Sequence, residues 1–121
     1  MTHPSLAQAL ESALRDPDPG ARQRALTQLE DLSDPEIVRP LVEAVRDEDP
    51  TVRALALGHL EDLGDPSAAP AVIGALDDEE AHVREAAAAA LRELRGADAA
   101  TAMIDALRQE RPFVRATVLV A

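Results

Sequence analysis

The sequence contains no cysteine, tryptophan, tyrosine or lysine, and these absences exclude several kinds of site. Without cysteine there can be no disulfide, thiolate zinc site or Cys nucleophile. Phe113 is the only aromatic residue among 121, so the core has to be built from Leu, Val, Ile and Ala. Side chains of this size suit short helices that pack closely together.

Long hydrophobic runs are also missing. The N-terminal stretch MTHPSLAQAL has no basic region followed by an apolar segment, so it does not resemble a signal peptide. No other segment approaches the roughly 18 apolar residues that a membrane span requires. We therefore expect a cytoplasmic protein of one domain, residues 1–121, with no membrane contact.

The charge is strongly acidic, because 12 basic residues, all of them Arg, face 23 acidic ones, and 12 − 23 = −11. Such a surface repels phosphate backbones, so nucleic acid is not expected as a partner. Two interpretations remain: a partner with a basic surface, or adaptation to a salty cytoplasm. Loss of Lys together with abundant Asp, Glu, Ala and Arg resembles proteins of extreme halophiles, which favours the second interpretation.

Residues of one type recur every 31 positions along the chain. Arg22, Arg53, Arg84 and Arg115 are 31 residues apart, and the apolar set Leu14, Val45, Leu76 and Leu107 has the same spacing. Self-similarity at such a period is typical of solenoids. The pattern predicts an all-α fold of four two-helix units, at about 4–33, 34–64, 65–96 and 97–121, the last one truncated.

Local signals predict where the helices of these units begin and end. The spacing of apolar residues indicates helices over 4–15, 19–32 and 81–95. Asp34-Pro35 and Asp65-Pro66 place an acidic N-cap before Pro at the first helical position. Pro40 should bend its helix, and Pro70, one position earlier in its unit, should cause a smaller kink. Glu11 replaces an apolar residue of the later units, so the first unit is expected to cap the array.

The unit motif, D-x-D-P-x-V-R-x-x-A-x-x-x-L with G-D-P at its end, resembles the HEAT-like repeats of the phycobilisome-lyase type, and the resemblance spans nearly the whole chain. It implies a right-handed α-solenoid whose second helices line a concave face. It also implies that a recurrent Asp and Arg tie the turns together. The matching residues are Asp16, Arg22, Asp47, Arg53, Asp78, Arg84 and Arg115, with Gln109 in place of the last acid.

These arginines admit two interpretations. They could form a row of guanidinium groups that binds an anion, or a structural ladder that links turn carboxylates and carbonyls within or between units. Repetition in every unit is what nearest-neighbour stability requires, whereas a binding site normally breaks the symmetry. The sequence therefore favours the ladder.

The positions that vary between units predict a partner-binding ridge on the concave face. Leu55 and Phe113 are its large apolar side chains, and such side chains serve as anchors at interfaces. The ridge residues that we predict are Gln23, Arg24, Thr27, Leu55, Asp62, His82, Glu85, Glu93, Phe113 and Ala116. Thr51, Ala54 and Gly58 vary at neighbouring offsets.

No catalytic residues, metal ligands or cofactor are predicted. HEAT-like hydroxylases bind two irons through His-Glu pairs, and no His-Glu pair occurs at the matching positions of this chain. His3, His59 and His82 are far apart in sequence and are interpreted as solvent-facing. HEAT-like glycosylases hold DNA in a basic groove with aromatic residues, and both features are missing.

The sequence therefore predicts a non-catalytic scaffold or adaptor that binds another protein. The alternative is an accessory protein, lyase-like or chaperone-like, that handles a chromophore or cofactor on the same surface. Val114, Val118, Leu119 and Val120 form an apolar end without a visible helix cap. Either the chain dimerises through this end or it is a fragment of a longer array.

Overall fold

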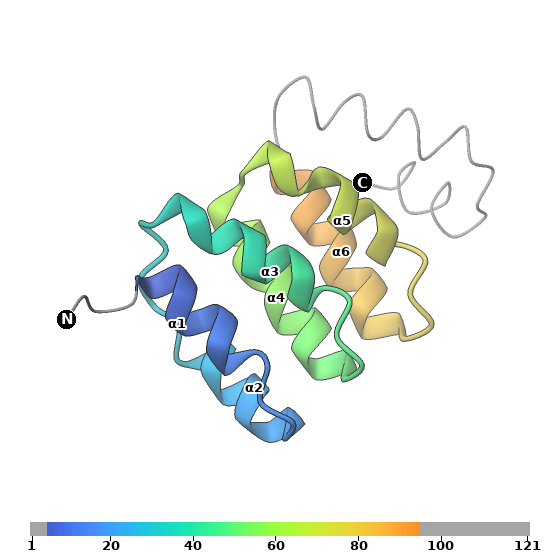
Figure 1. The fold of residues 1–121 in the computed structure, drawn as a ribbon. Coiled ribbons are helices and arrows are strands. Elements are labelled where there is room, and N and C mark those ends of the chain that lie inside the picture. The colour runs from blue at the N-terminus through green and yellow to red at the C-terminus, as the bar shows by residue number, and fades with distance from the viewer. Residues whose placement is uncertain (1–4, 95–121) are drawn as a thin grey trace.

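The computed structural model describes residues 5–94, and this part of the chain is helical without any strand. Its elements are α1 (Leu6–Ala13), α2 (Pro19–Thr27), the 3-10 helix η1 (Pro35–Ile37), α3 (Val38–Ala44), α4 (Pro50–Leu63), the 3-10 helix η2 (Pro66–Ala68), α5 (Ala69–Ala75) and α6 (Ala81–Glu93). Consecutive helices pair, so that α1, α3 and α5 form one layer and α2, α4 and α6 the other (Figure 1). The all-α class is confirmed, whereas the fourth predicted unit lies outside the described residues.

Short polar side chains begin most of these helices. In α1, Ser5 Oγ accepts from the amide of Gln8, and Gln8 Oε1 accepts from the amide of Ser5, which forms a capping box. Aspartates followed by proline precede α2, α4, η1 and η2, and each carboxylate accepts a hydrogen bond from a backbone amide of the first turn. The predicted N-caps Asp34 and Asp65 are thus confirmed.

The first helices of the second and third units are each divided into a 3-10 turn and an α-helix. Pro40 is the third residue of α3 and Pro70 the second residue of α5. Proline has no backbone amide to donate, so it is tolerated in the first turn of an α-helix but not further inside. The α-helix therefore begins just before each proline, and the residues that precede it form a separate 3-10 turn. The helix is divided in the same way in both units. The structure therefore does not show the larger bend at Pro40 and the smaller one at Pro70 that their positions predicted.

Helix α2 ends at Thr27, five residues before the predicted end at residue 32. We attribute this difference to the residue that follows the predicted end of the helix. Helix α4 is terminated by Gly64, the residue after its last one, whose φ of 62° lies in the left-handed region that glycine adopts without strain. The first unit has Ser33 there, and its amide and hydroxyl donate to Asp31 in a local turn that replaces the last helical turn.

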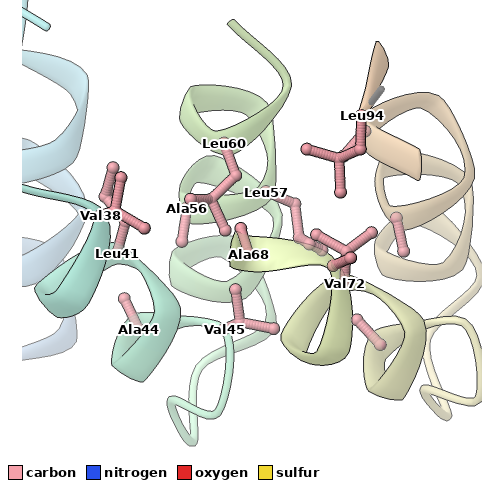
Figure 2. Close-up of a cluster of buried hydrophobic side chains, with 14 of the residues drawn as sticks. Val38, Leu41, Ala44, Val45, Ala56, Leu57, Leu60, Ala68, Val72 and Leu94 are labelled. Carbon is pink, nitrogen blue, oxygen red and sulfur yellow. The ribbon is translucent and has the colours of Figure 1, made fainter. Parts of the chain in front are cut away.

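Aliphatic side chains between the two layers form the core (Figure 2). Leu41, Leu57, Leu60 and Val72 have no exposed surface, and alanines such as Ala56 let the helices approach closely. A fully buried leucine such as Leu57 typically contributes about 2 to 5 kcal/mol relative to alanine. The core therefore needs no aromatic residue, as the composition predicted.

The first unit shows how the array begins within the described residues. Glu11, which replaces an apolar residue of later units, is half-buried and forms an ion pair with Arg15 at 2.9 Å. A pair four residues apart on an exposed helix surface adds only a few tenths of a kcal/mol. The side chain of Glu11 thus remains partly exposed to solvent in the described structure.

Candidate interaction surface

Arg22, at the start of α2, joins the first unit to the second. Its Nη1 donates to the carbonyl oxygen of Asp16 at 2.7 Å, within its own unit. Its Nη2 donates to Oδ1 of Asp47 at 3.0 Å, and its Nε lies 3.0 Å from Oδ2 of the same carboxylate. The guanidinium therefore binds both oxygens of a carboxylate in the next unit, a geometry that is more specific than a single ion pair. The hydrogen bond to Asp47 is the main reason that the pKa of Arg22 is raised.

The same arrangement follows one unit later at Arg53, the only buried charged residue in the described chain. Its Nη1 donates to the carbonyl oxygens of Asp47 and Glu48 at 2.8 and 3.1 Å. Its Nη2 donates to Oδ1 of Asp78 at 3.1 Å, and its Nε lies 2.9 Å from Oδ2. In the third unit, Nη1 of Arg84 donates to the carbonyl oxygen of Asp78 at 2.6 Å.

The aspartates of this arrangement, which we call the Arg–Asp ladder (Asp16, Arg22, Asp47, Arg53, Asp78 and Arg84), also shape their own turns. Oδ1 of Asp47 accepts from the amide of Asp49, and Oδ1 of Asp78 accepts from the amide of Glu80, both at 2.9 Å. Each of these carboxylates therefore orders a turn and receives the arginine of the preceding unit. The guanidinium groups of Arg22 and Arg53 are occupied by carboxylates and carbonyls, which leaves little room for an anion at these two residues. Gln109 and Arg115 lie outside the described residues.

A second polar link between the first two units involves Gln23, which was predicted to belong to the partner-binding ridge. Its Nε2 donates to Oδ2 of Asp49 at 2.9 Å, while the same oxygen caps α4 by accepting from the amide of Val52 at 3.0 Å. The hydrogen bond from Gln23 is the main reason that the pKa of Asp49 is lowered. The side-chain amide of Gln23 thus donates one hydrogen bond within the protein.

His59 contributes a link that the sequence did not indicate. Its Nε2 lies 2.6 Å from the carbonyl oxygen of Leu26, in the last turn of α2, and the ring is half-buried. Because a carbonyl oxygen only accepts, Nε2 carries the proton and donates it. The interpretation of His59 as solvent-facing is therefore wrong. The same carbonyl oxygen accepts from the backbone amide of Leu29 at 3.2 Å, so the imidazole adds a second hydrogen bond at the C-terminal end of α2.

The exposed side of α2, α4 and α6, which we call the second-helix face, carries the other predicted ridge residues. The described ones are Arg24, Thr27, Leu55, Asp62, His82, Glu85 and Glu93, all exposed except Leu55, which is half-buried. Arg24 lies 3.8 Å from the carboxylate of Asp18, a weak surface pair. Phe113 and Ala116, the predicted C-terminal end of the ridge, lie outside the described residues, as do Val114, Val118, Leu119 and Val120.

A shallow groove of about 460 Å³, which we call the α4 groove, runs along this face. Thr51, Ala54, Leu55, Gly58, His59, Glu61, Asp62 and His82 line it. Ala54, Leu55 and Gly58 give it an apolar floor, whereas Glu61 and Asp62 lie at the end of the groove where α4 terminates. Within residues 5–94, no side-chain hydrogen bond or ion pair engages Glu61 or Asp62.

The described chain has further hollows outside the second-helix face. The largest, about 780 Å³, lies on the opposite layer, where Glu11, Glu36 and Glu43 surround Arg39 and the prolines of α3 and η1. Residues 5–94 contain no group of three or more His, Asp or Glu side chains that could hold a metal ion. No helix in this part of the chain is long and apolar enough to cross a membrane.

Comparison with known proteins adds one positive result. The family model for HEAT repeats matches residues 4–72 and again residues 41–121, so the two matches together span nearly the entire chain. No curated protein matches the sequence.

Proposed function

The chain belongs to the HEAT repeat family, and we propose that it is a non-catalytic scaffold that binds another protein through the second-helix face. HEAT repeats commonly mediate contacts between proteins. One observation carries the proposal: the ladder and the core are satisfied within the array, whereas the α4 groove presents apolar surface and carboxylates that no described residue engages. Apolar surface with a polar border is typical of interfaces.

The test compares two substitutions to aspartate, one in each layer of helices. Leu55, in the α4 groove, and Val42, in the opposite hollow, are both half-buried aliphatic residues on helices. The tagged wild-type chain, Leu55→Asp and Val42→Asp should each be used to isolate proteins from a native lysate at high salt. We expect a specific protein to be recovered with wild type and Val42→Asp but not with Leu55→Asp. Recovery that is unaffected by Leu55→Asp would contradict binding through this face.

The volume of the α4 groove supports a second candidate function. About 460 Å³ lies within the range of small-molecule sites, which is roughly 300 to 1,000 Å³. An accessory protein that handles a chromophore or cofactor could use this surface, as the resemblance to phycobilisome-lyase repeats implies. The ultraviolet and visible absorption of the chain purified from its native source separates the two functions, since a bound pigment absorbs light and a scaffold without a pigment remains colourless.

Finer features of the array belong to the same proposal. We propose four units with a period of 31 residues, a right-handed stack in which the second-helix face is the concave one, and a salty cytoplasm as the setting for the acidic surface. The apolar segment with Val114, Val118, Leu119 and Val120 would then be covered by a second copy. Light scattering at high salt tests the dimer, because a strict monomer would exclude it.

A further inference from the structure

We infer that the α4 groove binds a basic amphipathic segment of a partner protein, with an aliphatic side chain over Gly58 and Lys or Arg residues beside Glu61 and Asp62. The inference rests on the proposed scaffold function and specifies the chemistry of the partner. It is drawn from the shape of the groove floor, from the position of its two carboxylates and from the charge of the chain.

The floor of the groove is open at Gly58. A Cβ atom at this position would meet no described atom within 4 Å, so the glycine opens toward solvent and not toward a packed neighbour. Glycine in a helix interior disfavours folding relative to alanine, and no packing contact in the fold accounts for it. Between Ala54 and Leu55 on one side and Asp62 on the other, it leaves a recess in which a partner side chain can reach the backbone of α4.

The dimensions of the groove fit a short helix. Thr51 and Asp62 are the first and last residues of α4 that line it, and the 62 − 51 = 11 residue steps from one to the other correspond to about 16 Å along the axis of α4. A partner helix of about 11 residues has the same length, and its apolar stripe would be just long enough to cover the floor.

Glu61 and Asp62 occupy a position that folding does not favour. They lie in the last turn of α4, which contains no basic residue, and the C-terminal end of a helix carries a partial negative charge. Some carboxylates of the array have structural partners: Asp49 caps a helix, and Asp47 and Asp78 bind arginines. Glu61 and Asp62 have none among the described residues. These two unpaired carboxylates border an apolar groove, where a basic side chain of a partner can reach them.

Charge also distinguishes between possible occupants. A second copy of this chain would bring its own net charge of −11 and its own Glu61 and Asp62 to the groove, so the two faces would repel each other. A basic segment is attracted by the same charges and relieves the repulsion at the end of α4. The groove is therefore complementary to a basic partner and not to a second copy.

The experiment is a selection from a library of random peptides of about 12 residues, slightly longer than the groove. The immobilised full-length chain is the target, and the bound peptides are sequenced. We expect enrichment of peptides that combine Lys or Arg with Leu, Ile or Val at helical spacing. One enriched peptide is then labelled, and its affinity is measured by fluorescence anisotropy for the wild type and for two pairs of variants.

Each pair contains a groove variant and a matched control on the other layer. Gly58→Leu places a side chain in the groove, where an added Cβ meets no described atom within 4 Å, and Gly74→Leu makes the same change in α5, where an added Cβ also meets none. The double variant Glu61→Gln/Asp62→Asn removes two charges at the groove, and Glu36→Gln/Glu43→Gln removes two exposed charges from the opposite layer. We expect both groove variants to weaken binding by at least about tenfold, and both controls to change it by less than about threefold.

The outcomes separate this inference from the scaffold proposal. Enriched peptides that lose affinity in Gly58→Leu but contain no excess of basic residues would overturn the inference and leave the scaffold intact. Equal loss with Glu36→Gln/Glu43→Gln would also overturn it, because the attraction would then be non-specific. If no peptide is enriched, or if Gly58→Leu has no effect, both the inference and binding through the second-helix face are refuted.

Discussion

Replacing Arg53 by alanine tests how far the Arg–Asp ladder holds neighbouring units together. The arginine side chain is only 11% exposed and the Asp78 side chain 12%, so the ion pair between them is almost fully shielded from water. The substitution removes both contacts to this carboxylate and the hydrogen bonds to the carbonyls of Asp47 and Glu48. The carboxylate of Asp78 would then keep only the amide of Glu80 as a partner.

The expected loss of unfolding free energy is about 3 to 5 kcal/mol, the range found when one partner is removed from a buried pair. A natural domain has a total stability of only about 5 to 15 kcal/mol, so this is a large fraction. The substitution should also make unfolding less cooperative, because units two and three would then be joined mainly by the packing of α4 on α6.

The assay is urea denaturation followed by circular dichroism at a fixed salt concentration. Arg46→Ala is the control, since Arg46 is exposed and lies just before the same turn; it should change the stability by less than about 0.5 kcal/mol. Arg53→Lys should recover only part of the loss, because a single ammonium group cannot bind both carboxylate oxygens and two carbonyls. If Arg53→Ala and Arg46→Ala lower the stability equally, the ladder does not stabilise the array.

Three further predictions concern single features of the array. Gly64→Ala should cost about 1 to 2 kcal/mol because its φ is 62°, whereas Gly58→Ala should stabilise α4 by up to about 1 kcal/mol; thermal unfolding compares the two. Because the pKa of Asp49 is lower in the folded state than in the unfolded state, where it is near 3.9, its ionised form stabilises the fold above about pH 4, and this stabilisation is lost as the pH falls through the folded pKa. Asp49→Asn should therefore flatten the decrease in unfolding free energy below about pH 4. An unchanged dependence of stability on pH would contradict this. Between dilute buffer and molar salt the melting temperature should rise by at least about 5 °C if the acidic surface is adapted to salt, and a melting temperature indifferent to salt would refute that interpretation.

Local signals allowed much of the fold to be predicted from the sequence. An aspartate before proline specifies a helix start through atoms only two or three residues apart, so Asp34 and Asp65 could be recognised without a structure. The early end of α2 also had a local signal, because Ser33 stands where the next unit has Gly64. That signal was outweighed by Leu29 and Leu32, which continue the helical spacing and pack against the core without being helical.

Contacts between units could not be derived in the same way. The period showed that an arginine and an aspartate recur, but not that Arg22 reaches the carboxylate of the next unit while binding only the carbonyl of its own. The hydrogen bond of His59 to Leu26 depends on where a neighbouring helix ends. The α4 groove depends in turn on Gly58 having open space beside it, which spacing alone does not reveal.

The direction of the Arg–Asp ladder determines how the length of such an array can change. Arg22 and Arg53 each reach forward to the following turn, so the two junctions within residues 5–94 each have a donor side and an acceptor side. Deletion of residues 47–77, one period of 31, would place Arg22 opposite Asp78 and restore the same junction. A deletion whose length is not a multiple of 31 residues would misalign donor and acceptor. The protein can thus gain or lose whole modules in tandem, and libraries of shorter or longer arrays can be built by joining units at this point.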